Sequence, residues 1–210
     1  MATDPWPVPR ALTGRLVSLE LLREDHAEAL PASASDPEVW RWKLMPRPTT
    51  VAEMAATIRD RLLVDPTGAR RQPFLVTRLS DAAAIGSTTL YDLNVVHGCV
   101  EIGETWFDRS CWGQGYNEDS KHVLLTYCFG SLGLGRVAWR VDNLNTRSQE
   151  ALRRMGFVYE GTLRSHRRRP DGSRRDSVYF SLLVNEWPAC SARLLELIQA
   201  RAPQPGAPTS

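Results

Sequence analysis

Alternating apolar and polar side chains predict strands in the first half of the chain, and helical spacing predicts two helices among them. Residues 15–21 alternate in this way, which is typical of a half-buried strand. Residues 23–32 and 50–64 carry apolar side chains at helical spacing, and Thr50 can cap the second of these helices. The alternation returns in three further segments, which predicts strands at residues 72–79, 84–91 and 100–107.

A glycine-rich turn separates the two halves of the chain. Residues 111–117 read Cys-Trp-Gly-Gln-Gly-Tyr-Asn, and a long helix is expected after them over residues 118–132. The remaining pattern predicts a strand at 136–141, a helix at 146–155, strands at 157–163 and 177–184, and a final helix at 186–200. This order predicts one α/β (α+β) domain over residues 13–201. The proline-rich ends, residues 1–12 and 202–210, are expected to form an extended arm and a disordered tail.

Composition and charge exclude several classes of protein. Hydrophobic residues make up 42% of the 210 residues and charged residues 24%, which is typical of a globular protein with a core. The 26 basic and 24 acidic residues nearly cancel, so a nucleic-acid partner is not expected. No apolar stretch reaches the roughly 20 residues of a membrane span, so no membrane partner is expected either. The four cysteines show no metal-ligand spacing, and we expect reduced thiols in a cytoplasmic protein without a metal.

The glycine turn is the strongest candidate for ligand binding. Gly113 and Gly115 let the backbone turn sharply and approach a ligand closely. The first N–H groups of the following helix have no partner within the helix and lie at its positive end, so they suit a phosphate. The spacing matches neither a Walker loop nor a dinucleotide fingerprint. A tight turn without a ligand is an equal alternative.

A second candidate lies further along, at Asn145 and Ser148. Asn145 follows a predicted strand and can hydrogen-bond an amide-bearing ligand. Ser148 is expected in the first turn of the next helix, where its hydroxyl can face a cleft. The alternatives are that Asn145 caps the helix and that Ser148 is a solvated surface hydroxyl.

Four motifs in order carry a resemblance to a known family. They are Glu101-Ile-Gly-Glu-Thr-Trp-Phe107, the turn Trp112-Gly-Gln-Gly-Tyr-Asn117, Asn145-x-x-Ser148, and Met155-Gly-Phe157-Val-Tyr-Glu-Gly161. Together they resemble the GNAT acyltransferase superfamily, most closely its bacterial branch that includes the ribosomal-protein N-terminal acetyltransferases. The resemblance covers residues 13–190 and implies a single-domain GNAT fold, with a mixed, mostly antiparallel sheet of about seven strands flanked by helices.

The resemblance implies acetyl-CoA as the cosubstrate. In that superfamily the backbone amides of the glycine turn bind the pyrophosphate, and the preceding strand holds the pantetheine arm. The cofactor-binding residues implied here are Thr105, Trp106, Phe107, Trp112, Gly113, Gln114, Gly115, Tyr116, Asn117, Asn145 and Ser148. The family pattern has Gly or Ala where this chain has Asn117, which favours altered contacts over loss of binding. Ser148 matches the position proposed as general acid in the ribosomal-protein branch.

Acyl transfer to an amine needs a proton acceptor, because only the neutral amine attacks. Glu101 and Glu104 are candidate bases, and alternation places them on opposite sides of their strand unless a bulge intervenes. Glu104 is the preferred base, since a carboxylate on an otherwise apolar face is costly without a purpose. An ion pair with an arginine is the alternative for Glu104. Part of the related branch has a base glutamate in the segment that here reads His-Arg-Arg-Arg, so His166 is a further candidate.

Two further features concern the acceptor. Trp40 and Trp42 can grip an aromatic or peptide-like acceptor, or they belong to the core or to a dimer face. The arginine-rich segment 164–175 is either a solvated loop or a positive rim that attracts an anionic acceptor or the 3′-phosphate of CoA. Cys111 is expected to pack in the protein rather than to act as a nucleophile.

The sequence therefore predicts an acyl-CoA-dependent N-acetyltransferase. It would move an acetyl group from acetyl-CoA to an amine by direct attack in a ternary complex. The acceptor would be a protein or peptide N-terminus or a small-molecule amine, and a homodimer is a further expectation for this branch. Two alternatives stay open: the same fold with another acyl-CoA such as succinyl-CoA, and a non-catalytic CoA-binding module.

Overall fold

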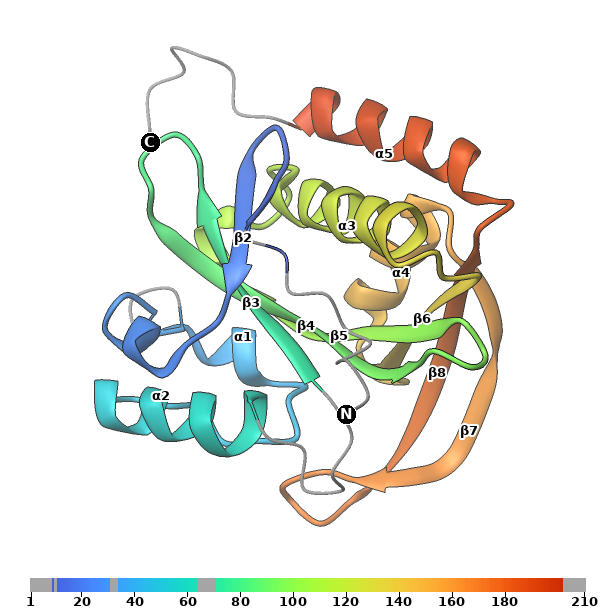
Figure 1. The fold of residues 1–210 in the computed structure, drawn as a ribbon. Helices are drawn as coiled ribbons and strands as arrows, with labels where there is room; N and C mark the ends of the chain where they lie inside the picture. The colour runs from blue at the N-terminus through green and yellow to red at the C-terminus, as the bar shows by residue number, and fades with distance from the viewer. Residues whose placement is uncertain (1–8, 10, 31–33, 64–70, 202–210) are drawn as a thin grey trace, which may run out of the picture.

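Eight strands form one sheet in the computed structural model, which describes residues 9, 11–30, 34–63 and 71–201 (Figure 1). In sheet order they are β1 (Leu12–Thr13), β2 (Val17–Leu21), β3 (Arg71–Arg78), β4 (Ala84–Asn94), β5 (Cys99–Phe107), β6 (Arg136–Asp142), β8 (Arg174–Leu183) and β7 (Val158–Arg168). Neighbouring strands are antiparallel except β5 and β6, which are parallel. The predicted α/β fold with a mixed, mostly antiparallel sheet is confirmed, and β1 adds a strand to the number expected.

Helices cover both faces of the sheet (Figure 1). On one side lie α3 (Tyr116–Thr126), which continues into a π-helical turn (Tyr127–Ser131), α4 (Thr146–Met155) and α5 (Trp187–Arg201). On the other side lie a 3-10 helix (Glu24–Glu28), α1 (Pro37–Trp40), and α2 (Val51–Thr57) with its π-helical turn (Ile58–Leu62). A short 3-10 helix (Arg109–Cys111) connects β5 to α3. No helix among the described residues is both long and apolar enough to cross a membrane.

Two apolar cores result from this arrangement. The larger lies between the sheet and the α3 side, and Phe74 and Phe180 are fully buried in it. The second lies under α1 and α2 and includes Met54, Ile58 and Trp106. Burial of these side chains supplies most of the driving force for folding. Polar side chains buried beside them are costly, so each of these needs a structural or functional reason.

Several element boundaries differ from the sequence-based expectation. The helix predicted at 23–32 is only the 3-10 helix at Glu24–Glu28, and residues 31–33 lie outside the described part. α3 begins at Tyr116, before the predicted start, because Gly115 has a φ of 85° and allows the chain to turn directly into the helix. Most of the extended arm and all of the disordered tail that the sequence predicts also lie outside the described residues.

The sheet opens between β5 and β6. These two strands pair only over residues 99–101 and 136–138, at their beginnings. Beyond these pairs the strands separate, and their open ends lead to α3 and α4. Parallel strands that separate in this way leave room for a ligand between them.

A β-bulge interrupts β5 beside this opening. Glu104 and Thr105 together face the single residue Thr88 of β4, because the flanking pairs are Gly103 with Thr89 and Trp106 with Ser87. Glu104 has a φ of 49°, in the left-handed region that non-glycine residues seldom adopt. The strain is thus located at a candidate catalytic residue.

The bulge reverses the alternation of side chains along β5. Val100 and Ile102 belong to the core on the α3 side, whereas Trp106 belongs to the core on the opposite side. Glu101 and Glu104 consequently lie on the same side of the sheet, away from α3. Simple alternation, as assumed from the sequence, predicts that they lie on opposite sides and that Glu104 shares a face with the apolar residues 100 and 102. The bulge makes this prediction wrong.

Candidate active site

A cleft of about 480 Å³ occupies the opening between β5 and β6. Its walls come from the ends of these strands, the first turns of α3, one face of α4 and the segment that follows α1, with single arginines from β7, β8 and α5. This volume is within the usual range for a small-molecule site. The predicted site residues that line it are Trp42, Glu104, Thr105, Trp106, Phe107, Trp112, Gly113, Asn117, Asn145 and Ser148.

Backbone N–H groups gather at one end of the cleft, where α3 begins. Gly115 is the N-cap of α3, and Tyr116 is the first helical residue. Within the described part of the chain, no hydrogen-bond acceptor is found for the backbone N–H groups of Gly113, Gln114, Gly115, Tyr116 and Asn117. Such N–H groups at the positive end of a helix bind phosphate. This cradle therefore fits a diphosphate.

Positive side chains surround the same end of the cleft. The guanidinium of Arg147 lies 3.3 Å from the centroid of the Trp112 ring, a cation–π contact that covers the turn. Arg154 and Arg201 lie 3.5 Å and 3.4 Å from Oε1 of the buried Glu118. Two arginines against one carboxylate leave a net positive charge beside the cradle, which suits a phosphate-bearing ligand.

Asn145 and Ser148 meet at the start of α4. Oδ1 of Asn145 accepts a hydrogen bond from the backbone N–H of Ser148 at 3.1 Å, so Asn145 is the N-cap of α4. Both residues also line the cleft. Capping uses only the amide oxygen, and within the described residues the amide nitrogen of Asn145 and the hydroxyl of Ser148 have no hydrogen-bond partner. Both groups are available to a ligand.

Glu104 forms an ion pair with a lysine inside the cleft. Nζ of Lys43 lies 3.4 Å from Oε2 of Glu104 and donates to the carbonyl oxygen of Thr105 at 3.1 Å. Burial raises the pKa of Glu104, but the positive charges of Lys43, Arg71 and Arg175 and the hydrogen bond from Lys43 together outweigh burial, so the net shift is downward. Glu104 is therefore ionised at neutral pH, and its partner is a lysine rather than the arginine considered from the sequence.

Glu101 is buried beside the cleft and does not line it. Its carboxylate accepts a hydrogen bond from the hydroxyl of Tyr91 and lies 3.3 Å from Nε of Arg140. Burial raises the pKa of Glu101, and Arg140 opposes this rise only in part. Glu101 thus positions Arg140 and Tyr91, whereas Glu104 presents its carboxylate to the cleft.

Lys121 is a cleft residue that the sequence analysis missed. Its Nζ lies 2.8 Å from Oγ1 of Thr105 and 3.2 Å from Oγ1 of Thr88, and the residue is 3% exposed. Burial, with a smaller contribution from the charge of Lys43, lowers the pKa of Lys121 to about 7. One sequence feature could have drawn attention to Lys121, because the chain contains only two lysines. In the structure both lysines contact Thr105.

Several predicted site residues do not line the cleft. Besides Glu101, they are Gln114, Gly115 and Tyr116 of the glycine turn, and Trp40 and His166. Trp40 packs in the second core, where its ring centroid is 5.6 Å from that of Trp106, so of the two tryptophans only Trp42 lines the cleft. His166 lies on β7 and is not among the lining residues. Burial and nearby arginines lower the pKa of His166, so its imidazole is neutral at pH 7.

Comparison with known proteins decides the family. Residues 16–158 match the sequence profile described as acetyltransferase (GNAT) domain. This chain belongs to the GNAT acetyltransferase family. The fold, the glycine turn at the start of α3 and the opening between β5 and β6 all accord with the resemblance seen in the sequence.

Known relatives extend over most of this GNAT acetyltransferase. The N-acetyltransferase p20 of Bacillus licheniformis is 30% identical over 178 residues, which cover 83% of this chain and 96% of p20. The protein named "Putative ribosomal N-acetyltransferase YdaF", from Bacillus subtilis strain 168, is 35% identical over 109 residues, which cover 52% of this chain and 58% of YdaF. The crystal structure of a GCN5-related N-acetyltransferase from Brucella melitensis is similar with a TM-score of 0.82 and 27% identity, over 90% of this chain and 86% of that one.

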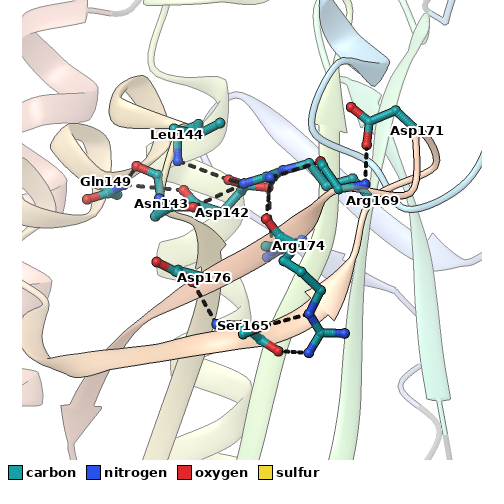
Figure 2. A network of polar contacts seen from close by, with 11 residues as sticks. Asp142, Asn143, Leu144, Gln149, Ser165, Arg169, Asp171, Arg174 and Asp176 are labelled. Carbon is teal, nitrogen blue, oxygen red and sulfur yellow. Dashed lines mark hydrogen bonds and ion pairs between the residues drawn. The ribbon is translucent and has the colours of Figure 1, made fainter.

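In this GNAT acetyltransferase an arginine ties the β7–β8 hairpin to the end of β6 (Figure 2). Arg169 donates to both carboxylate oxygens of Asp142, at 2.8 Å and 2.9 Å, and to Oδ1 of Asn143 at 3.1 Å. Burial raises the pKa of Asp142, but the hydrogen bonds from Arg169 and from the backbone N–H of Leu144, together with the charges of Arg175 and Arg169, outweigh burial and the net shift is downward. Nearby, Arg174 donates to the side chain and backbone of Ser165. The arginine-rich segment is therefore mostly paired strand rather than a solvated loop.

Proposed function

We propose that this enzyme transfers an acetyl group from acetyl-CoA to the α-amino group of a protein or peptide N-terminus. One observation carries the proposal: two features lie at the same cleft. They are the free N–H groups at the start of α3 and the carboxylate of Glu104, which the bulge of β5 presents to the cleft. The acceptor class draws support from the name of the relative YdaF. A small-molecule amine is the second acceptor class, and the cleft can admit it as well.

Acetyl-CoA would be held along one wall of the cleft. The GNAT family uses an acyl-CoA as donor, and the free N–H groups of residues 113–117 fit its pyrophosphate. The backbone of Thr105 to Phe107 faces the open edge of β5 and would receive the pantetheine arm. The amide of Asn145 and the indole of Trp112 line the path between these two regions.

The chemistry would use Glu104 and Ser148. Glu104 accepts a proton from the acceptor ammonium, directly or through a water, and leaves a neutral amine. The amine nitrogen attacks the thioester carbonyl carbon, a C–N bond forms, and the C–S bond breaks. Ser148 gives its hydroxyl proton to the departing sulfur and takes one from the nitrogen. The products are an acetylated amine and free CoA, with no covalent acyl-enzyme.

The same proposal places the enzyme in the cytoplasm. All four cysteines are free thiols in the structure, and free thiols persist in reducing compartments. A homodimer, which the resemblance leads us to expect, stays a prediction that light scattering on the purified protein can test.

Substitution of Asn117 tests the cradle. Asn117 lies in the first turn of α3 and lines the cleft. A carboxylate at this position repels a diphosphate, although it stabilises the helix itself. For Asn117→Asp we expect calorimetry to show CoA affinity weaker by about tenfold or more, with no loss of thermal stability. Asn117→Ala should bind CoA close to wild type, and equal binding by all three proteins, or none by wild type, contradicts the proposal.

The two alternatives are separated by kinetics. An assay of thiol release with acetyl-CoA and with succinyl-CoA, against a panel of peptides and amines, identifies the acyl donor. If CoA binds normally but no amine promotes thiol release, the chain is a CoA-binding module and the enzymatic proposal fails.

A further inference from the structure

Three arginines from neighbouring strands converge on the cleft. Arg140 of β6, Arg167 of β7 and Arg175 of β8 all line it. Arg167 lies directly opposite Arg175, and Arg140 lies opposite Tyr179 of β8, so the three side chains share one side of the sheet. This is the side of Glu101, which pairs with Arg140, and it faces away from α3.

The carboxylates of the described residues leave Arg167 unpaired and Arg175 with only a shared partner. Oδ2 of Asp142 lies 3.6 Å from Nε of Arg175, but the Asp142 carboxylate is already bonded to Arg169 through both of its oxygens. Among the described residues, Nε of Arg175 has no hydrogen-bond partner, although the residue is only 6% exposed. Arg167 is an exposed residue that lines the cleft, and it has no side-chain hydrogen bond or ion pair within the described part of the chain. A buried charged donor without an acceptor is costly, and a ligand can remove that cost.

The charge of the three arginines helps to lower the pKa of a neighbouring histidine. The pKa of His166 is lowered by burial and by the positive charges of Arg167, Arg140 and Arg175. An acceptor amine that enters this region is subject to the same field, which favours its neutral, reactive form. The same field repels an acceptor that carries only positive charge and attracts one that also carries negative charge.

The phosphates of CoA do not account for these arginines. The cradle at the start of α3 has cations of its own, Arg147 and Arg154, on the α3 and α4 side of the sheet. Arg167 and Arg175 come from the β7–β8 hairpin on the opposite side of the cleft. They belong to the half of the cleft where Lys43, Glu104 and an acceptor would meet.

We infer that the acceptor carries a carboxylate near its amine, and that Arg167 and Arg175 bind this carboxylate. The inference rests on the proposed function and narrows its substrate class. Guanidinium groups bind carboxylates through paired hydrogen bonds, which matches the free Nε of Arg175 and the unpaired Arg167. Two sources share this chemistry: the α-carboxylate of a free amino acid, and an acidic side chain near the N-terminus of a peptide.

Matched acceptors distinguish the two sources. The free amino acid source is tested with alanine against alaninamide, and the peptide source with amidated Ala-Glu-Ala against amidated Ala-Gln-Ala. We expect wild type to favour the acid over its amide in one of these pairs, with kcat/KM higher by about tenfold or more. In Arg167→Gln the preference should fall close to one, because kcat/KM for the acid should fall much further than kcat/KM for the amide. Comparing each ratio between wild type and variant cancels the intrinsic reactivity of each amine.

Two further variants control for folding and for charge. Arg168→Gln removes the neighbouring arginine, which is exposed and does not line the cleft, and it should keep the wild-type preference. Arg175→Lys keeps the buried positive charge, and it should retain part of the preference because the ammonium still attracts the carboxylate but lacks the paired donors of a guanidinium. These variants separate loss of the carboxylate site from general loss of charge on the hairpin.

The measurements distinguish failure of the carboxylate site from failure of the proposed function. Equal kcat/KM for acid and amide in wild type, or a preference that Arg167→Gln leaves intact, overturns the inference while acetyl transfer itself stands. If no acceptor promotes thiol release, the proposed function fails, and the carboxylate site is then tested by calorimetry with the N-acetylated acids and amides. Binding of an acid to wild type, but not to Arg167→Gln, supports the site, and equal binding or none overturns it.

Discussion

Nζ of Lys121 lies 2.8 Å from Oγ1 of Thr105, and this contact brings to the bulge of β5 an amine whose pKa burial lowers to about 7. The second lysine of the chain, Lys43, reaches the carbonyl oxygen of the same threonine. Thr105 is thus held through its hydroxyl and its backbone, and the bulge that carries Glu104 is fixed from two directions. A rigid bulge is what a cleft needs if it is to hold a thioester and an amine in a reactive arrangement.

The low pKa of Lys121 predicts a pH-dependent stability. Its pKa is about 7 in the folded protein against an ordinary value of 10.5, so between these pH values the unfolded chain binds more protons. The free energy of unfolding of wild type should therefore rise by about 1.4 kcal/mol per pH unit relative to Lys121→Met, which cannot titrate. Urea unfolding of both proteins at pH 7.5 and 9.5 measures this difference.

Lys121→Arg is the control for this measurement. Arginine keeps its charge at every accessible pH, so the variant should be less stable than Lys121→Met throughout and should show no gain as the pH rises. Parallel stability profiles for wild type and Lys121→Met would mean that Lys121 is not buried in the folded protein.

Glu104 and Glu101 should respond differently to the same substitution. Glu104→Gln removes the carboxylate that faces the cleft, and we expect kcat to fall by about a hundredfold or more with CoA affinity unchanged. Glu101→Gln instead removes the nearest carboxylate of the half-buried Arg140, which keeps only the more distant Asp92 at 4.0 Å, and we expect a loss of about 2 kcal/mol in the free energy of unfolding, with kcat of the folded protein largely kept. Steady-state kinetics and urea unfolding on both variants check this, and a larger loss of kcat in Glu101→Gln would reverse the two assignments.

Asp142 should be essential for the docking of the β7–β8 hairpin. Asp142→Asn leaves Arg169 and the buried Arg175 without a carboxylate, and we expect stability to fall by about 3 kcal/mol, with faster proteolysis in residues 164–175. Because the pKa of Asp142 is lowered, its contribution is present above the pKa of an unfolded aspartate, about 3.9, and is lost as the pH falls through the folded value.

Asp171→Asn provides the matched control on the same hairpin. Its carboxylate accepts hydrogen bonds from Ser173 in the exposed turn and forms no ion pair within the described residues. We expect a change within about 0.5 kcal/mol. Similar losses in Asp142→Asn and Asp171→Asn would show that the network in Figure 2 does not hold the hairpin.

Cys111 should be dispensable for catalysis. Its thiol lines the cleft but is 3% exposed, and burial raises its pKa, so the reactive thiolate is disfavoured. Cys111→Ala should keep kcat within about threefold of wild type, with a modest loss of stability from the small cavity that remains. A folded Cys111→Ala protein without activity would instead indicate a covalent acyl-enzyme.

Local pattern was enough to predict most elements of the fold. The strand predicted at 136–141 and the helix predicted at 146–155 match β6 and α4 within one residue. The turn before α3 could also be predicted from the sequence, because glycine by itself allows the left-handed conformation that Gly115 adopts. The predicted helix at 23–32 was wrong, since apolar spacing over so short a segment cannot distinguish an α-helix from a 3-10 turn.

The arrangement of charges in the cleft could not be predicted in the same way. Whether Glu101 and Glu104 lie on the same side of the sheet depends on one extra residue in β5. The local sequence pattern does not predict this bulge. The pairing of Lys43 with Glu104 joins residues 61 positions apart. Trp40 and Trp42 differ by two positions, yet one packs in the core and the other lines the cleft.

By itself the amino-acid sequence determined the order of helices and strands, the family, and the position of the turn that precedes α3. These depend on the spacing of apolar residues and on backbone freedom at single glycines, which are local properties. Only the tertiary structure decided which side chains meet in the cleft, and so which amines, carboxylates and guanidinium groups are charged there. Strand register and burial set those contacts and pKa shifts, and both arise only when distant segments pack together.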